Sequence, residues 1–222
     1  MRPSTPAPGR PSVNDLTVHG LEPPHVTGLP RRREAIRKSL HIAISLAAAA
    51  LVLTLPAATA RLLFIATAGV ALLVDFGRLA RTPLRRPFLR LFAPLLRDSE
   101  TRALTGASTL ALGFAAAVLL FDASFAAAGI LYAGLADAAA AIAGRTIGRH
   151  RFASGKSLEG SGAFLVVATL IGWALPGIAL LAAFLAAVPL TLLEAVPLPV
   201  HDNLVLPPAG AAAAWIAVVA IG

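Results

Sequence analysis

The chain contains no cysteine and few charged residues. Without cysteine, neither a disulfide nor a thiolate metal site can form. Charged residues make up 14% of the 222 residues, whereas a soluble domain has about 25%. The first thirty residues contain no apolar run, which argues against a secretory signal peptide. A G-x-x-x-x-G-K-S/T loop is also absent, which excludes a P-loop nucleotide site.

Hydrophobic residues are abundant instead, at 57% of the chain, and the mean hydropathy is +0.79. The formal charge is +8. These charges lie between apolar runs rather than on one soluble face, which argues against a nucleic-acid partner. The composition therefore predicts a polytopic membrane protein of the all-α class.

The chain divides into a tail and a helical region. Residues 1–30 are rich in Pro, Gly, Ser and Thr, which predicts a disordered cytoplasmic tail. We expect residues 31–222 to form a transmembrane helical bundle of about seven helices, each near the roughly 20 residues that cross a bilayer. The apolar runs are 39–56, 61–80, 104–121, 124–143, 160–176, 177–196 and 208–222. The last run is short, and Pro176-Gly177 predicts a tight turn between the fifth and sixth.

Leucines and phenylalanines are set among arginines between the second and third runs, at 81–102. This spacing predicts an amphipathic interfacial helix, with a plain basic loop as the alternative. Pro83, Pro87 and Pro94 limit any such helix to short pieces.

Lysine and arginine are concentrated in alternate loops, which sets the expected orientation. The N-terminus is then cytoplasmic and the C-terminus is on the far side, in a multi-pass protein that we expect in a bacterial inner membrane. This topology gathers the unusual polar residues of distant segments at the cytoplasmic boundary. They are Arg37, Lys38, His41, Asp75, Arg78, Arg97, Glu100, Arg102, Asp137, Arg145, Lys156, Glu159, Glu194, Asp202 and Asn203. Such a rim suits an enzyme that acts on a charged cytosolic substrate and a lipid.

The residue types at this rim indicate phosphate chemistry. Carboxylates and an amide supply oxygen ligands for Mg²⁺, and arginine and lysine neutralise phosphate oxygens. The densest cluster is 137–161, where Asp137 lies several residues inside an apolar run. A charge at that depth costs about 2.5–3.5 kcal/mol. Gly144, Gly148 and Gly160 would let backbone N–H groups approach a polyphosphate, although Gly144-x-x-x-Gly148 could equally be a helix-packing motif.

Several blocks resemble the CTP-dependent lipid alcohol kinase family, which includes dolichol kinase, phytol kinase and CTP-dependent diacylglycerol kinase. Residues 33–41 are similar to its opening R-K-x-x-H. Residues 137–148 resemble D-x-x-A-x-x-x-G-R-x-x-G, and residues 156–161 resemble K-S/T-x-E-G-S/T. Glu194 followed by 202–207 is similar to a late E and D-N-L-x-x-P. The resemblance covers about residues 31–210 and implies transfer of the γ-phosphate of CTP to the hydroxyl of a membrane lipid alcohol.

The resemblance and the residue types together give role assignments. Asp137, Asp202 and Asn203 are the Mg²⁺ ligand candidates. Glu159 or Glu194 could bind metal or accept the alcohol proton, and His41 is a further candidate base. The phosphate or nucleotide contacts are Arg37, Lys38, Arg145, Lys156, Gly144, Gly148, Gly160 and Ser161.

Two other functions remain open. One is a CTP:phosphatidate cytidylyltransferase, although the lysine/histidine/aspartate tail signature of that family is missing. The other is a small transporter, whose charges would be expected near the bilayer midplane. The sequence does not distinguish phytol, a polyprenol and diacylglycerol as acceptor.

Overall fold

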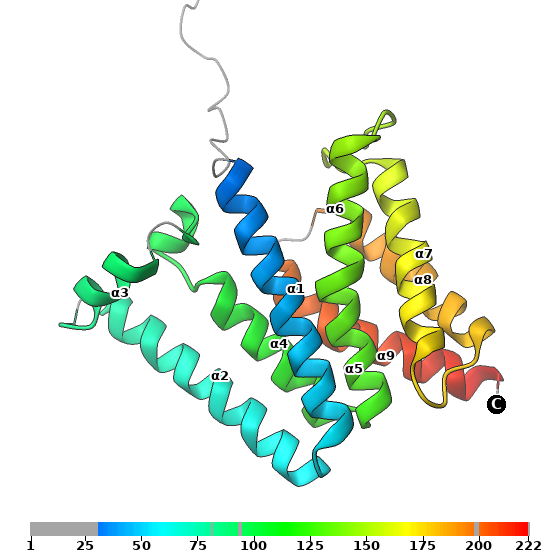
Figure 1. Cartoon of the computed structure of the whole chain (residues 1–222), viewed down its shortest axis with the longest axis horizontal. Coiled ribbons are helices and arrows are strands. Elements are labelled where there is room, and N and C mark those ends of the chain that lie inside the picture. The colour runs from blue at the N-terminus through cyan, green and yellow to red at the C-terminus, as the bar shows by residue number, and fades with distance from the viewer. Residues whose placement is uncertain (1–30, 81, 93–94, 198–199, 222) are drawn as a thin grey trace, which may run out of the picture.

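The computed structural model describes residues 31–80, 82–92, 95–197 and 200–221. Every regular element in this part of the chain is helical, which confirms the all-α prediction (Figure 1). The predicted tail at 1–30 lies outside the described residues. The elements are α1 (Arg31–Thr54), α2 (Ala57–Leu79), α3 (Arg85–Phe92), η3 (Asp98–Thr101), α4 (Gly106–Leu120), α5 (Ala123–Leu131), η4 (Tyr132–Ala136), α6 (Asp137–Thr146), α7 (Leu158–Ala174), α8 (Leu180–Ala195) and α9 (Asp202–Ile221).

Among the described residues, four helices are long and apolar enough to cross a membrane, which indicates a membrane protein. They are α1, α2, α9 and the continuous helix Ala123–Thr146, which α5, η4 and α6 form together. The apolar helices α4, α7 and α8 are shorter, at 15, 17 and 16 residues. The predicted turn between α7 and α8 is present, with Gly177 at a φ of 78° that favours glycine.

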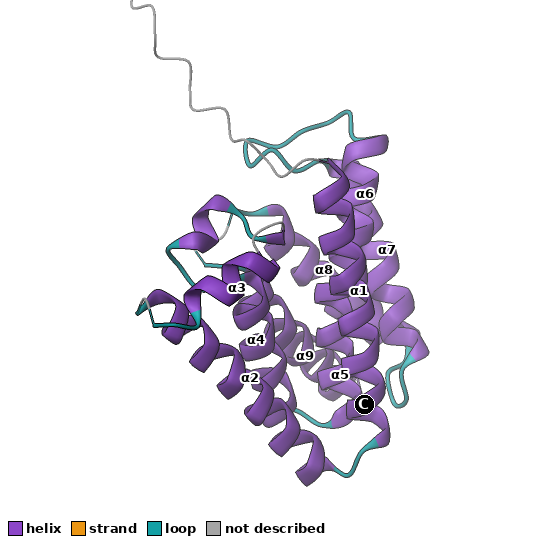
Figure 2. Cartoon of the chain, turned by 60° about the vertical axis from the view of Figure 1, so that its left-hand side comes forward, coloured by secondary structure: helices purple, strands orange, loops and turns teal. Residues whose placement is uncertain are grey.

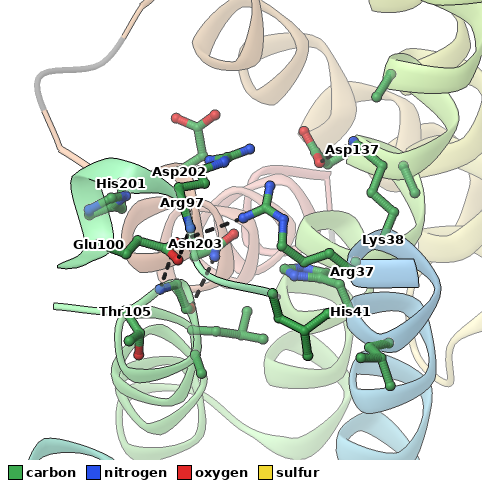
Figure 3. Close-up of a pocket in the computed structure, with 18 of the residues that line it drawn as sticks. Arg37, Lys38, His41, Arg97, Glu100, Thr105, Asp137, His201, Asp202 and Asn203 are labelled. Carbon is green, nitrogen blue, oxygen red and sulfur yellow. Dashed lines mark hydrogen bonds and ion pairs between the residues drawn. The ribbon is translucent and has the colours of Figure 1, made fainter. Parts of the chain in front are cut away.

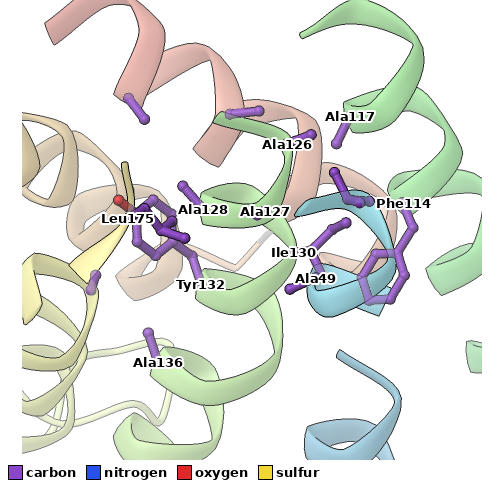
Figure 4. Close-up of a cluster of buried hydrophobic side chains, with 14 of the residues drawn as sticks. Ala49, Phe114, Ala117, Ala126, Ala127, Ala128, Ile130, Tyr132, Ala136 and Leu175 are labelled. Carbon is purple, nitrogen blue, oxygen red and sulfur yellow. The ribbon is translucent and has the colours of Figure 1, made fainter. Parts of the chain in front are cut away.

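The helix α5 lies in the centre of the bundle and contacts α1, α4, α7 and α9. Ala126, Ala127, Ala128 and Ile130 are fully buried there (Figure 4). Apolar lipid offers little hydrophobic drive for helices to associate, so small residues that allow close packing dominate such interfaces. The alanine-rich sequence therefore suits the innermost helix.

Glycines mark the closest crossings between these helices. A Cβ added at Gly129 of α5 would lie 2.0 Å from the carbonyl oxygen of Pro207 in α9. One added at Gly210 of α9 would lie 2.9 Å from the Cα of Gly129. The two backbones therefore touch, which fixes the position of α9 against α5.

The prediction that the last helix begins at 208 is wrong, because α9 begins at Asp202 and continues through Pro207 and Pro208. A proline inside a helix removes a hydrogen bond to the carbonyl four residues earlier. The freed carbonyls of Asn203 and Leu204 face Gly113 of α4, where an added Cβ would lie 2.3 and 3.2 Å from their oxygens. Close backbone contact of this kind is one way that a neighbouring helix accommodates prolines in a membrane helix.

The basic segment before the first apolar run is also helical and forms the start of α1. Within 81–102, the helical pieces are short, as the prolines predicted: α3 has 8 residues and η3 has 4. No described residue of α3 is buried.

Candidate active site

A cavity of about 1040 Å³ lies at one end of the bundle. Its walls come from α1, α2, α3, α4, the η4–α6 segment, the loop before α7, and the facing ends of α8 and α9. Figure 3 shows charged side chains from α1, the segment around η3, α6 and α9 gathered around the same space. Segments far apart in the sequence thus build a single site.

The structure brings together all but two of the predicted site residues. Those that line the cavity are Arg37, Lys38, His41, Asp137, Gly144, Arg145, Lys156, Gly160, Ser161, Glu194, Asp202 and Asn203. Glu159 and Gly148 are not among the residues that line it.

The α1 residues project from one helix end into the cavity. Lys38 Nζ lies 3.8 Å from Asp137 Oδ2. The Arg37 guanidinium lies 3.2 Å from Glu34 Oε1 and 3.8 Å from Glu100 Oε1. His41 Nε2 lies 3.1 Å from the carbonyl oxygen of Ala133. A carbonyl only accepts, so Nε2 carries the proton, and Nδ1 of a neutral His41 is left as an acceptor.

Asp137 is the first residue of α6 and follows η4, a turn of π-helix. Such turns interrupt the regular α-helical hydrogen bonds and often occur at functional sites. The Asp137 side chain is 34% exposed. Its carboxylate is therefore accessible from the cavity although its helix is apolar.

Lys156 joins three elements at the opposite wall. Its ammonium lies 3.0 Å from Glu194 Oε1 and 3.8 Å from Asp202 Oδ2, and it donates a hydrogen bond to the Glu194 carbonyl oxygen. Glu194 is 6% exposed, and its other carboxylate oxygen accepts a hydrogen bond of 3.4 Å from the Ser161 hydroxyl. A buried carboxylate needs such partners. The Ser154 hydroxyl donates a second hydrogen bond from this loop to the end of α8, 3.0 Å long, to the Ala195 carbonyl oxygen.

Glu159 stabilises the loop between α6 and α7. Its carboxylate accepts from the His150 backbone N–H, and His150 Nδ1 lies 2.8 Å from Oε1. Hydrogen bonds from backbone N–H groups, its own first, and from the His150 ring lower the pKa of Glu159 to about 2. These contacts support a structural role for Glu159.

Gly144 of α6 and Gly160 of α7 lie where these two helices pack together, and Gly148 lies in the loop after α6. A Cβ added at Gly148 would lie 2.3 Å from the Gly144 carbonyl oxygen, and one at Gly160 would lie 2.8 Å from the Ala140 carbonyl oxygen. Both glycines, and Gly144, also lie against the Ser157 hydroxyl. Gly144 therefore packs against the start of α7, as the helix-packing alternative expects, whereas the closest neighbour of Gly148 is the carbonyl oxygen of its own segment.

Sequence reasoning assigned no role to a buried ion pair on α2. Arg78 and Asp75 are 2% and 1% exposed and lie 2.8 Å apart. Arg78 donates to the carbonyl oxygens of Glu100, Thr101 and Ala103. Asp75 Oδ2 accepts from the backbone N–H and the hydroxyl of Thr105. The signal in the sequence was an acid and a base three residues apart within an apolar run.

This pair holds the segment that presents Glu100 to the cavity. Glu100 Oε1 accepts from Gly106 N–H, and Oε2 accepts from Arg97 N–H. Asn203 Nδ2 donates to the Gly106 carbonyl oxygen, so the start of α9 is tied to the start of α4.

The described residues contain no group of three or more histidines or carboxylates placed to hold a metal ion on their own. Mg²⁺ commonly binds one or two carboxylates and takes its other ligands from water and substrate phosphates. The Asp137 and Asp202 side chains are 34% and 44% exposed, and both line the cavity. This oxygen donor set fits an ion that arrives with a phosphate.

The chain was compared with protein families, curated proteins and solved structures. No protein family, curated protein or solved structure matches the chain.

Proposed function

We propose that the protein is an integral membrane kinase that transfers the γ-phosphate of CTP to the hydroxyl of a membrane lipid alcohol, such as a polyprenol or dolichol, phytol or diacylglycerol. The observation that carries this proposal is the cavity itself. Cations and carboxylates line one side of it, and apolar residues of α1 and α2 line another. A charged phosphate donor and a lipid acceptor could therefore meet there. The choice of CTP comes from the sequence resemblance.

Phosphoryl transfer depends mainly on positioning and charge neutralisation. Lys156, Arg145, Arg37 and Lys38 supply positive charge around the cavity. In this proposal they orient the triphosphate and compensate its oxygens. Asp137 and Asp202, with Asn203 beside them, would hold Mg²⁺, which when bound offsets charge on the phosphates.

The hydroxyl oxygen of the lipid forms a bond to the γ-phosphorus, the bond to the β–γ bridging oxygen breaks, and CDP leaves. The hydroxyl proton needs an acceptor at the cavity wall. We assign it to His41 Nδ1, because Nε2 is engaged with Ala133. Glu194 is the other candidate, but Lys156 already neutralises its carboxylate.

We further propose that all seven apolar helices cross or enter a bacterial inner membrane, with the cavity on the cytoplasmic side and α3 in the headgroup layer. The N-terminus is then cytoplasmic and the C-terminus is outside. Accessibility labelling of tags before Met1 and after Gly222 tests this topology. Both tags on one side would show that one helix does not cross.

The deciding experiment uses purified protein, Mg²⁺, γ-labelled CTP and vesicles that contain each lipid alcohol in turn. We expect label on the lipid, and we expect EDTA to abolish the transfer. A cytidylyltransferase given phosphatidate would release the label as pyrophosphate, and a transporter would leave CTP intact. Either result, or use of ATP with none of CTP, would contradict the proposal.

A further inference from the structure

The apolar side of the cavity lies where α1 and α2 diverge. The two helices meet at the turn around Leu55 and separate with distance from this turn. Helix α1 packs on α5 and η4, whereas α2 packs on α4 (Figures 1 and 2). Leu40 and Ile44 of α1 and Ala71 and Val74 of α2 line the cavity in this region. Helices α1 and α2 are both long enough to span the bilayer, and in a bilayer that they cross, the space between them would face lipid.

This side of the cavity is open. Leu40 and Ile44 are 45% and 51% exposed although both line the cavity. Both side chains therefore reach the outer surface of the described helices as well as the cavity, which places the lateral edge of the cavity at the gap between α1 and α2.

Polarity changes along the α1 wall. Arg37, His41 and Ile44 share a helix face, because positions i, i+4 and i+7 do. At 1.5 Å per residue, the wall passes from a guanidinium to an aliphatic side chain over about 10 Å. A molecule along this face would have its polar end near His41 and its apolar end at the opening.

The short helix α3 contributes aromatic residues to the same cavity. Phe88 and Phe92 line it, with ring centroids 5.0 Å apart. The Phe88 ring lies 5.3 Å from the guanidinium carbon of Arg78, which anchors α3 to the end of α2. Phenylalanines beside arginines on a short helix are typical of a helix that lies in the membrane interface.

We propose that the gap between α1 and α2 is the binding site for the hydrocarbon chain of the acceptor lipid, which enters sideways from the bilayer. The identity of the acceptor rests on the proposed function, but the chain site rests on the opening, the apolar wall and its continuity with the charged wall. A hydrocarbon chain is favoured over an apolar peptide because the opening lies between membrane-spanning helices.

The test uses the full chain in vesicles with a long-chain alcohol that carries a photoactivatable diazirine. Adducts are mapped by mass spectrometry, with and without excess unlabelled alcohol. We expect competable adducts on the cavity-facing residues of α1 and α2, and adducts on outward faces that do not compete. Ile44→Trp and Val74→Phe, from opposite walls, should each lose the competable adducts. Leu46→Trp is the matched control, because Leu46 is similarly exposed at 48% and does not line the cavity.

Melting in detergent shows that each variant is folded, and the two walls provide independent tests. Wall adducts that do not compete, or that persist in both folded wall variants, would overturn the proposal. Competable wall adducts without phosphate transfer from CTP to any alcohol would instead overturn the proposed function and leave the chain site standing.

Discussion

The ammonium of Lys38 on α1 lies 3.8 Å from a carboxylate oxygen of Asp137 on α6, at the wall of the cavity. A lysine and an aspartate from different helices thus neutralise each other. A phosphate and Mg²⁺ would compete for these same two groups. Under the proposed function, substrate binding should therefore change the interaction between these two side chains.

Asp137→Asn keeps the size and a polar oxygen of the side chain but removes its charge. We expect transfer to fall by about 10²–10³-fold, the usual effect of losing one transition-state electrostatic contact, while the protein stays folded. Asp122→Asn is the matched control, because Asp122 is the residue just before α5 and makes no side-chain capping bond. Equal turnover in the two variants would remove Asp137 from the site.

Lys156→Ala should reduce both activity and stability. Glu194 would lose its cation while 6% exposed, and an unpaired buried carboxylate destabilises by about 1–3 kcal/mol or more. Adding Glu194→Gln should recover stability without activity. Thermal melting of the two single variants and the double variant measures this coupling, and strictly additive effects would show that the pair is not linked.

Arg78→Met should destabilise the protein by roughly 3–5 kcal/mol, because it leaves the buried Asp75 without a cation. Three loop carbonyls also lose their donor, so the segment that carries Glu100 should loosen and transfer should slow. Arg86→Met on the exposed face of α3 provides the control. Unfolding midpoints in detergent distinguish the two, and matching midpoints would contradict a structural role for the pair.

Gly129→Ala should disrupt the contact between α5 and α9. The new Cβ would lie 2.0 Å from the Pro207 carbonyl oxygen, and overpacking typically costs about 1–3 kcal/mol. Gly69→Ala introduces the same methyl group where nothing lies within 4 Å. It should be neutral or slightly stabilising. A comparison of melting temperatures tests the prediction, which fails if the Gly129 variant is as stable as the Gly69 variant.

The loop before α7 should weaken in acid. Glu159 has a pKa of about 2 in the folded protein, below its ordinary value of 4.5. Its contribution is therefore complete above pH 4.5 and is lost as pH falls toward 2. Between pH 6 and pH 3, the melting temperature of the wild type should fall toward that of Glu159→Gln. A difference in melting temperature that stays constant over this range would contradict the prediction.

Much of the helix pattern could be predicted from the sequence, because apolar runs are unambiguous in a chain with so few charges. The site residues could be predicted to share one end of the bundle, since Arg37, Arg145 and Lys156 lie at the ends of apolar runs that the topology places on the same side. The start of α9 could not be predicted in this way. Pro207 and Pro208 normally indicate a helix boundary, and the packing of Gly113 against the carbonyls that they free is visible only in the structure.

Other features depended on contacts between distant segments. Glu159 follows Lys156 closely in the sequence, yet its carboxylate contacts His150 outside the cavity. The role of Arg78 depends on carbonyl groups more than twenty residues away, which no local pattern reveals.

The position of α9 has a consequence for biogenesis. It is the last of the described helices to be synthesised, yet it packs on α4, α5 and α8 and carries Asp202 and Asn203. Until it emerges, the glycine faces of α4 and α5 have no partner and the cavity lacks a wall. The packing of α4 and α5 around Gly113 and Gly129 is therefore completed only when translation reaches α9.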